Sequence, residues 1–152
     1  MSVLTTLRGL RAHRCARRFR RGTEVLEVAL IMFFILTPIC FGMVTYGYYF
    51  FLQHNLQNAA REGARAAIPL GGTSGDATSK ITAYLNQAGL TPANFTISII
   101  PDPGSATEGT DITVTVDGVW STVGVSALPQ ALGGISSGKV VRGRAVMRKE
   151  AS

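Results

Sequence analysis

The chain has 152 residues, 46% of them hydrophobic, and a formal net charge of +6. The charge is uneven: residues 1–21 carry seven arginines and no acidic residue, whereas the remainder carries eight basic and nine acidic residues. A nucleic-acid-binding domain spreads its basic side chains over a folded face, so this distribution argues against a nucleic-acid partner. The only cysteines are Cys15 and Cys40, which offer no basis for a disulfide-stapled fold.

The arginines are followed closely by a long apolar run. From Val28 to Leu52 the chain has 25 residues, none with a formal charge. As an α-helix rising ~1.5 Å per residue, this run is about 37 Å long, enough to cross the ~30 Å hydrocarbon core of a membrane. It is also longer than the roughly 7–15 apolar residues of a cleaved secretory signal. The sequence therefore predicts one membrane-spanning helix that stays with the protein.

The charges on either side of this run predict its orientation. Arginines near the end of a membrane helix stay on the cytoplasmic side, and the opposite flank has mixed charge. We therefore expect residues 1–22 to form a basic cytoplasmic leader. The part of the chain after about residue 55 is expected to lie outside the membrane.

The same helix is predicted to continue to residue 68, where a proline and two glycines end it. Residues 23–68 thus form a transmembrane and juxtamembrane helix. In its second part, small residues recur at three- and four-residue intervals: Ala60, Gly63, Ala64 and Ala67. Small residues let helices approach closely, so one interpretation is a packing seam for partner helices. The other is that alanines merely suit a helix that has left the lipid.

Residues 69–152 are predicted to form a small extracytoplasmic α+β module. A short helix fits first, with Asp76 or Ser79 as its N-cap. Alternating apolar and polar residues then predict three strands, at 95–99, at 111–116 and in the segment KVVRGRAVMRKE. We expect these strands to form an antiparallel sheet with one solvated face.

Few residues are suited to catalysis. The chain has two histidines, His13 in the leader and His54 just beyond the apolar run. No cluster of metal-ligand residue types appears, and no glycine-rich loop leads into a helix with a following lysine. We therefore predict a non-enzymatic protein with no cofactor and no metal site.

An acidic residue, Glu27, lies one turn deeper than Glu24 and immediately before the uncharged apolar run. A carboxylate at the centre of a membrane helix costs about 2.5–3.5 kcal/mol, and less near the interface. One interpretation is that Glu27 reaches back to the interface. The other begins with cleavage between Gly22 and Thr23, which would create an α-amine that is largely protonated at neutral pH. That amine lies four residues from Glu27, so the carboxylate gains a cationic partner in its own chain or in a neighbour.

A basic leader, Gly22, and an acid as the fifth residue after it resemble the processing signal of type IV pilins. A longer resemblance, over residues 20–67, is to the TadE-like family of tight-adherence pilus pseudopilins. It is carried by RRGTEVLEVAL, by LQNAAREGAR at 56–65, and by the residues between them, Pro38, Gly42 and Tyr46-Gly47. The chain departs from the pilin pattern at Val28, where an aromatic residue usually follows the acid.

The resemblance implies a minor pilin-like structural or assembly subunit of a tight-adherence pilus or a related secretion system. Such a protein is anchored by a single span in the bacterial inner membrane. Its partners are membrane lipid, other pilin-like subunits, the pilus assembly machinery and a prepilin peptidase. The resemblance assigns cleavage to Gly22 and Thr23, and processing or assembly to Glu27. The alternative is a membrane-tethered binding module, in which the helix is only an anchor.

Overall fold

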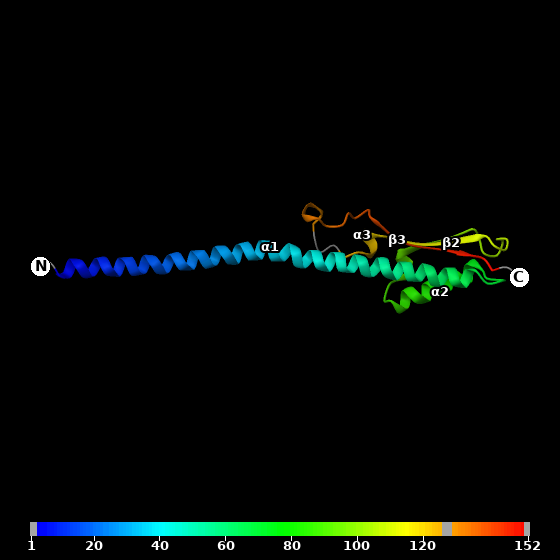
Figure 1. Ribbon diagram of the computed structural model, residues 1–152, viewed down its shortest axis with the longest axis horizontal. Coiled ribbons are helices and arrows are strands. Elements are labelled where there is room, and N and C mark those ends of the chain that lie inside the picture. The colour runs from blue at the N-terminus through cyan, green and yellow to red at the C-terminus, as the bar shows by residue number, and fades with distance from the viewer. Residues whose placement is uncertain (1–2, 126–128, 151–152) are drawn as a thin grey trace. The chain divides into compact units, whose positions relative to one another are not determined.

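The computed structural model describes the backbone of residues 3–125 and 129–150, and the side chains of residues 23–125, 129–131 and 133–150. It divides into two units, with the boundary between Phe41 and Gly42. The elements, labelled in Figure 1, are α1 (Val3–Ala67), α2 (Ser74–Gln87), η1 (Pro92–Asn94), β1 (Phe95–Ile100), β2 (Asp111–Val119), α3 (Trp120–Val123), η2 (Gln130–Leu132) and β3 (Val140–Arg148). The predicted α+β class is confirmed: one long apolar helix precedes a short helix and a three-stranded antiparallel sheet.

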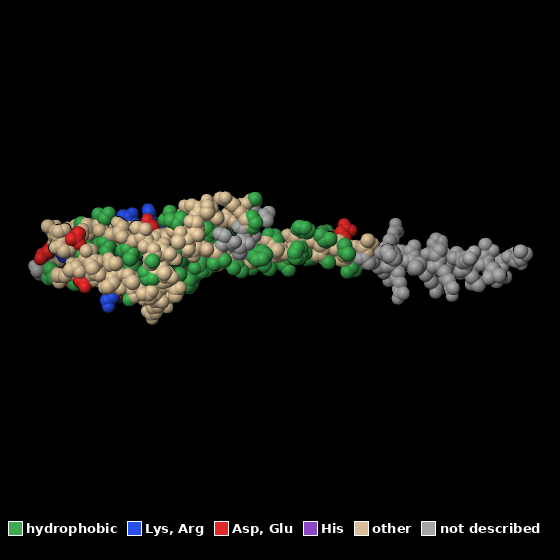
Figure 2. Space-filling view, turned by 180° about the vertical axis from the view of Figure 1, so that it is seen from behind, with side chains coloured by type: hydrophobic (Ala, Val, Ile, Leu, Met, Phe, Trp, Pro, Cys, Tyr) green, Lys and Arg blue, Asp and Glu red, His purple; other side chains and the backbone are tan. Residues whose placement is uncertain are grey.

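The first unit is helical, and its described side chains are mostly exposed. Large apolar residues dominate this surface, with exposed fractions such as 65% for Phe33 and 57% for Leu36. Hydrophobic side chains line the described part of this helix in Figure 2. In water such a surface would be unfavourable by about 25 cal/mol for each Å² of apolar area. Among the described residues, one helical stretch, Thr23–Ala67, is long and apolar enough to cross a membrane.

In the second unit, the chain itself begins to cover α1. Thr45 is 1% exposed, and Leu52 is completely buried. The predicted apolar run from Val28 to Leu52 is therefore divided, because its last eight residues lie beside the module rather than on an uncovered helix. The largely exposed part, Val25–Val44, has 20 residues and a length of about 30 Å, which matches the hydrocarbon core of a bilayer.

The core of the module forms where α1, α2 and the sheet meet. In Figure 1, α1 passes between α2 and the strands β2 and β3. Each element contributes one apolar face, spaced by three or four residues on the helices and by two on the strands. The buried residues are Leu52, Leu56, Ala59, Ala60, Ala64 and Ala67 from α1, Ala77, Ile81 and Leu85 from α2, Ile112, Val114, Val116, Val141 and Ala145 from the sheet, with Leu90 and Trp120.

Helix α2 begins one turn earlier than predicted. Its N-cap is Thr73, whose hydroxyl accepts a hydrogen bond of 3.1 Å from the backbone N–H of Asp76. The Asp76 carboxylate in turn accepts from the Thr73 hydroxyl at 2.7 Å and from its N–H at 3.2 Å. Asp76 is thus the third helical residue of a reciprocal capping box rather than the cap, and Ser79 is inside the helix. In the sequence, the segment TSGD at residues 73–76 shows the T-x-x-D pattern of this capping box.

This capping box predicts a pH dependence. The hydrogen bonds from the side chain and the backbone of Thr73 lower the pKa of Asp76 below 3.8. A depressed pKa contributes stability that is present above the unfolded value and is lost as pH falls through the folded value. Chemical denaturation of wild type and Asp76→Asn should therefore differ most above about pH 4 and converge in more acidic solution. A difference that grows on acidification would contradict the capping role.

The sheet has the order β1-β2-β3, and its alternation follows the prediction. Val116 pairs with Gly143 and Ile97, and all three lie on the face toward the core. The arginines of β3 lie on the opposite, exposed face. Arg142 donates through Nε and Nη2 to both carboxylate oxygens of Asp117, at 2.7 and 2.8 Å, and this pairing raises the pKa of Arg142. At these exposed positions the pair contributes little to stability.

The connection from β2 to β3 contains two short helical turns, α3 and η2. Trp120 in α3 is 1% exposed, and its ring lies 6.2 and 5.8 Å from the rings of Tyr48 and Tyr49 in α1. Further along, the carbonyl of Gly133 accepts a hydrogen bond of 2.8 Å from the Tyr46 hydroxyl. These contacts hold the connection against the first turns of α1 that the module covers.

Candidate membrane and assembly site

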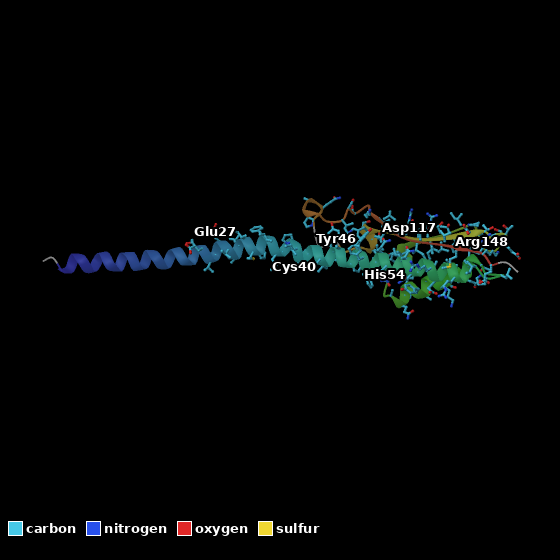
Figure 3. The ribbon with its side chains drawn as sticks, in the orientation of Figure 1. Glu27, Cys40, Tyr46, His54, Asp117 and Arg148 are labelled. Carbon is cyan, nitrogen blue, oxygen red and sulfur yellow. The ribbon has the colours of Figure 1, made fainter. Side chains whose placement is uncertain are left out.

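The predicted processing residues lie on α1 where the described side chains begin. Thr23 and Glu27 are both exposed and are separated by one helical turn, and the backbone of Gly22 is helical as well. Figure 3 shows the Glu27 side chain projecting from the helix. Its neighbours Val25 and Leu26 are 69% and 62% exposed. Within the described part of the chain, no ion pair or hydrogen bond to the Glu27 carboxylate is present.

The proposed seam has a different environment from the one expected. Ala60, Ala64 and Ala67 are completely buried in the core of their own chain. A Cβ atom added at Gly63 would lie 2.5 Å from Cδ1 and Cγ1 of Ile81 in α2. The small residues therefore allow close approach of α2, an element of the same chain. A partner helix could reach Gly63 only by displacing α2, and the three alanines are covered by their own chain.

A second close approach joins α1 to β3. A Cβ atom added at Gly143 would overlap the carbonyl group of Leu56 and lie 2.7 Å from the backbone nitrogen of Gln57. The obstacles are backbone atoms of α1, which cannot rotate away as a side chain can. A residue without a Cβ is therefore required where β3 crosses α1.

Two glutamines of α1 cover the outer edge of β3, and sequence reasoning missed them. The Gln57 side chain donates to the carbonyl of Arg144 at 2.6 Å and accepts from its N–H at 3.2 Å. One turn earlier, the Gln53 side chain donates to the carbonyl of Arg142 at 2.8 Å. An edge strand otherwise presents unpaired N–H and C=O groups to other chains. The two amides thus occupy part of the edge that a further strand would use.

We predict that Gln57→Met destabilises the module by about 1–2 kcal/mol, because it keeps the length of the side chain but removes both hydrogen bonds to β3. Denaturant unfolding of the full-length chain in detergent, followed by the fluorescence of Trp120, would measure this loss. Gln53→Met is the matched control, since it removes one hydrogen bond and should cost less. Equal stabilities of wild type and Gln57→Met would show that the amide contributes nothing.

The remaining polar groups do not converge on a reactive centre. His54 is exposed on α1 and borders a shallow groove lined by Phe50, Phe51, Gln53 and Gln57. Among the described residues, no group of three or more His, Cys, Asp or Glu side chains could hold a metal ion. The side chain of His13 lies outside the described residues. Among the described residues, the candidate functional features are thus the exposed apolar surface of α1 and the Glu27 carboxylate on it.

Residues 22–65 match the family model described as TadE-like protein. The match begins at the predicted cleavage glycine and ends within the part of α1 that the module covers. No curated protein and no solved structure matches the chain. The resemblance predicted from the sequence is therefore confirmed for residues 22–65, which match the TadE-like family model.

Proposed function

We propose that this protein is a minor pilin-like subunit that acts in the assembly of a tight-adherence pilus or a related secretion system. In this role it is a structural component and not an enzyme. The basic leader lies in the cytoplasm, α1 crosses the bacterial inner membrane once, and the α+β module lies outside. The family match supports an association with the pilus machinery, because it covers the helix through which such subunits are held.

The observation that carries this proposal is the carboxylate of Glu27 on an otherwise apolar, exposed helix. A membrane anchor needs no acid at this depth, and the acid makes insertion less favourable. Within the described residues nothing neutralises it. A positive partner from another chain, or from a new N-terminus at Thr23, would satisfy the carboxylate and would fix the stagger between neighbouring helices.

A further observation supports partners for the membrane part. A Cβ atom added at Gly42 or at Gly47 would meet nothing within 4 Å. Glycine in a helix interior costs about 1 kcal/mol relative to alanine, and the described chain offers no packing reason for it at either position. Close approach of another helix in the membrane would supply such a reason.

The function is tested by deleting the gene from its native host and counting surface pili by electron microscopy. We expect the deletion to lose pili and surface attachment, and the wild-type chain supplied in trans to restore both. Normal pili and attachment in the deletion strain, under conditions in which the parent is piliated, would contradict the proposal and favour the membrane-tethered binding module.

Processing is tested separately by mass spectrometry of the protein from native membranes. We predict that the mature chain begins at Thr23 when prepilin peptidase is active and keeps residues 1–22 when the peptidase gene is deleted. Gly22→Phe should block the cut in the presence of the peptidase, because a bulky side chain replaces hydrogen at the cleaved bond. An intact leader in the peptidase-positive strain would exclude cleavage but not the structural role.

A further inference from the structure

We propose that one end of the extracytoplasmic module rests on the headgroup region of the outer leaflet and binds lipid there. We call this surface the interfacial collar, and define it as residues 124–125, 129–131 and 133–134 together with Tyr46 and Phe50. The proposal rests on the membrane anchoring that is part of the proposed function. It adds a second lipid contact, made by a segment far from the membrane helix in sequence.

Charge distribution is the first observation. From Gly118 to Gly138 the chain has no Asp, Glu, Lys or Arg, and α1 has none from Val28 to Ala60. These two uncharged segments meet at the hydrogen bond between Tyr46 and Gly133. On the face shown in Figure 2, the visible charged side chains of the module gather toward its other end, which Figure 3 identifies by Arg148. A module surrounded by water on all sides has no reason to segregate its charges in this way.

Position along α1 is the second observation. The exposed apolar stretch Val25–Val44 accounts for the ~30 Å hydrocarbon core, and each headgroup region adds about 5–7 Å, or roughly four helical residues. This region therefore corresponds to residues 45–49, which begin where the module first covers α1. Tyr46 lies within it and bonds to the connection between β2 and β3.

The chemistry of the collar suits an interface better than water or hydrocarbon. Val125 and Phe50 are 45% and 66% exposed, while Tyr46 is 45% exposed with its hydroxyl bonded to a carbonyl. Tyrosine is enriched at this depth of membranes because its ring is apolar and its hydroxyl is polar. Pro129, Gln130 and Ala131 are exposed and uncharged. Lipid headgroups are thus the occupant that suits both the exposed apolar side chains and the uncharged polar groups of this loop.

Depth measurement by spin labelling tests the proposal on the full-length chain in vesicles of phosphatidylcholine and phosphatidylglycerol. In a Cys15→Ser/Cys40→Ser background, single labels are placed at Ala131 in the collar, at Met43 in the span and at Lys80 on α2. Oxygen, which concentrates in lipid, and a water-soluble nickel chelate are the two collision probes. We expect the label at Ala131 to collide with nickel several-fold less often than the label at Lys80, and more often than the label at Met43.

Each other outcome overturns the proposal for a different reason. Equal nickel access at Ala131 and Lys80, with Met43 protected, would show that the module stands clear of the bilayer while anchoring holds. Nickel access at Met43 would show that α1 does not cross the bilayer, and this result would contradict the membrane part of the proposed function. Protection at Ala131 that disappears as the protein is diluted in lipid would identify a second copy of this chain as the occupant.

Discussion

The variant Gly143→Ala should lose about 3 kcal/mol or more of stability, a large effect for the addition of one methyl group. The new Cβ would overlap backbone atoms of Leu56, so β3 must move away from α1. That movement also breaks the paired hydrogen bonds between Gln57 and Arg144, which lie one residue further along the strand. The cost of the strain and the cost of the lost hydrogen bonds therefore both reduce stability at the point where β3 crosses α1.

Unfolding of the full-length chain in detergent would measure this effect. Trp120 is the only tryptophan and is 1% exposed, so its emission reports on the core directly. Gly138→Ala is the matched control, because a Cβ at that position would meet nothing within 4 Å. Similar midpoints for both variants would show that β3 does not pack against α1 as described.

The variant Glu27→Leu should reduce surface pili to the level of the deletion strain. Leucine makes membrane insertion more favourable, so the amount of protein in the membrane should stay the same or rise. The loss would therefore reflect the missing carboxylate and not a missing anchor. Complementation of the deletion strain, with membrane fractions quantified beside pilus counts, is the measurement.

Glu24→Leu serves as the control for this variant. It also removes an acid from α1, but at a shallower position where water already solvates the carboxylate. We expect Glu24→Leu to restore pili. Full piliation by both variants would indicate that the helix is only a tether, as in the binding-module alternative.

Much of the fold follows from patterns in the sequence. The uncharged run predicts the long helix, and alternation at residues 95–99 and 111–116 predicts β1 and β2, because their apolar residues face one core. Helix α1 ends at Ala67, one residue before the predicted end at 68 and two residues before Pro69. These features depend on neighbours within a few residues, which a sequence displays directly.

Features that depend on distant contacts were predicted less well. Ala60, Gly63, Ala64 and Ala67 indicate close approach to a helix, but spacing alone does not say to which chain that helix belongs. At Gly63 that helix is α2 of the same chain. In the same way, the polar character of Gln57 in a helix leaving the membrane does not reveal its bonds to a strand 87 residues later.

The candidate site likewise combines features that the sequence predicts with features that depend on distant contacts. The position of Glu27 one turn after Thr23 is fixed by helical geometry, so the sequence alone placed it correctly on an apolar surface. The division of the apolar run at Thr45 depends on tertiary cover and is invisible in a hydropathy pattern. Under the proposed function, the carboxylate would be paired by another chain or by a new N-terminus at Thr23, and spacing within one sequence does not distinguish these partners.

In-membrane crosslinking tests the central claim most directly. A photoreactive residue at Val28, which is 57% exposed and adjacent to Glu27, would be activated in membranes of the native host. We predict adducts with other pilin-like subunits, identified by mass spectrometry, that disappear when Glu27 is replaced by leucine in the same chain. Adducts with lipid alone, or protein adducts unchanged by Glu27→Leu, would contradict an assembly role for this carboxylate.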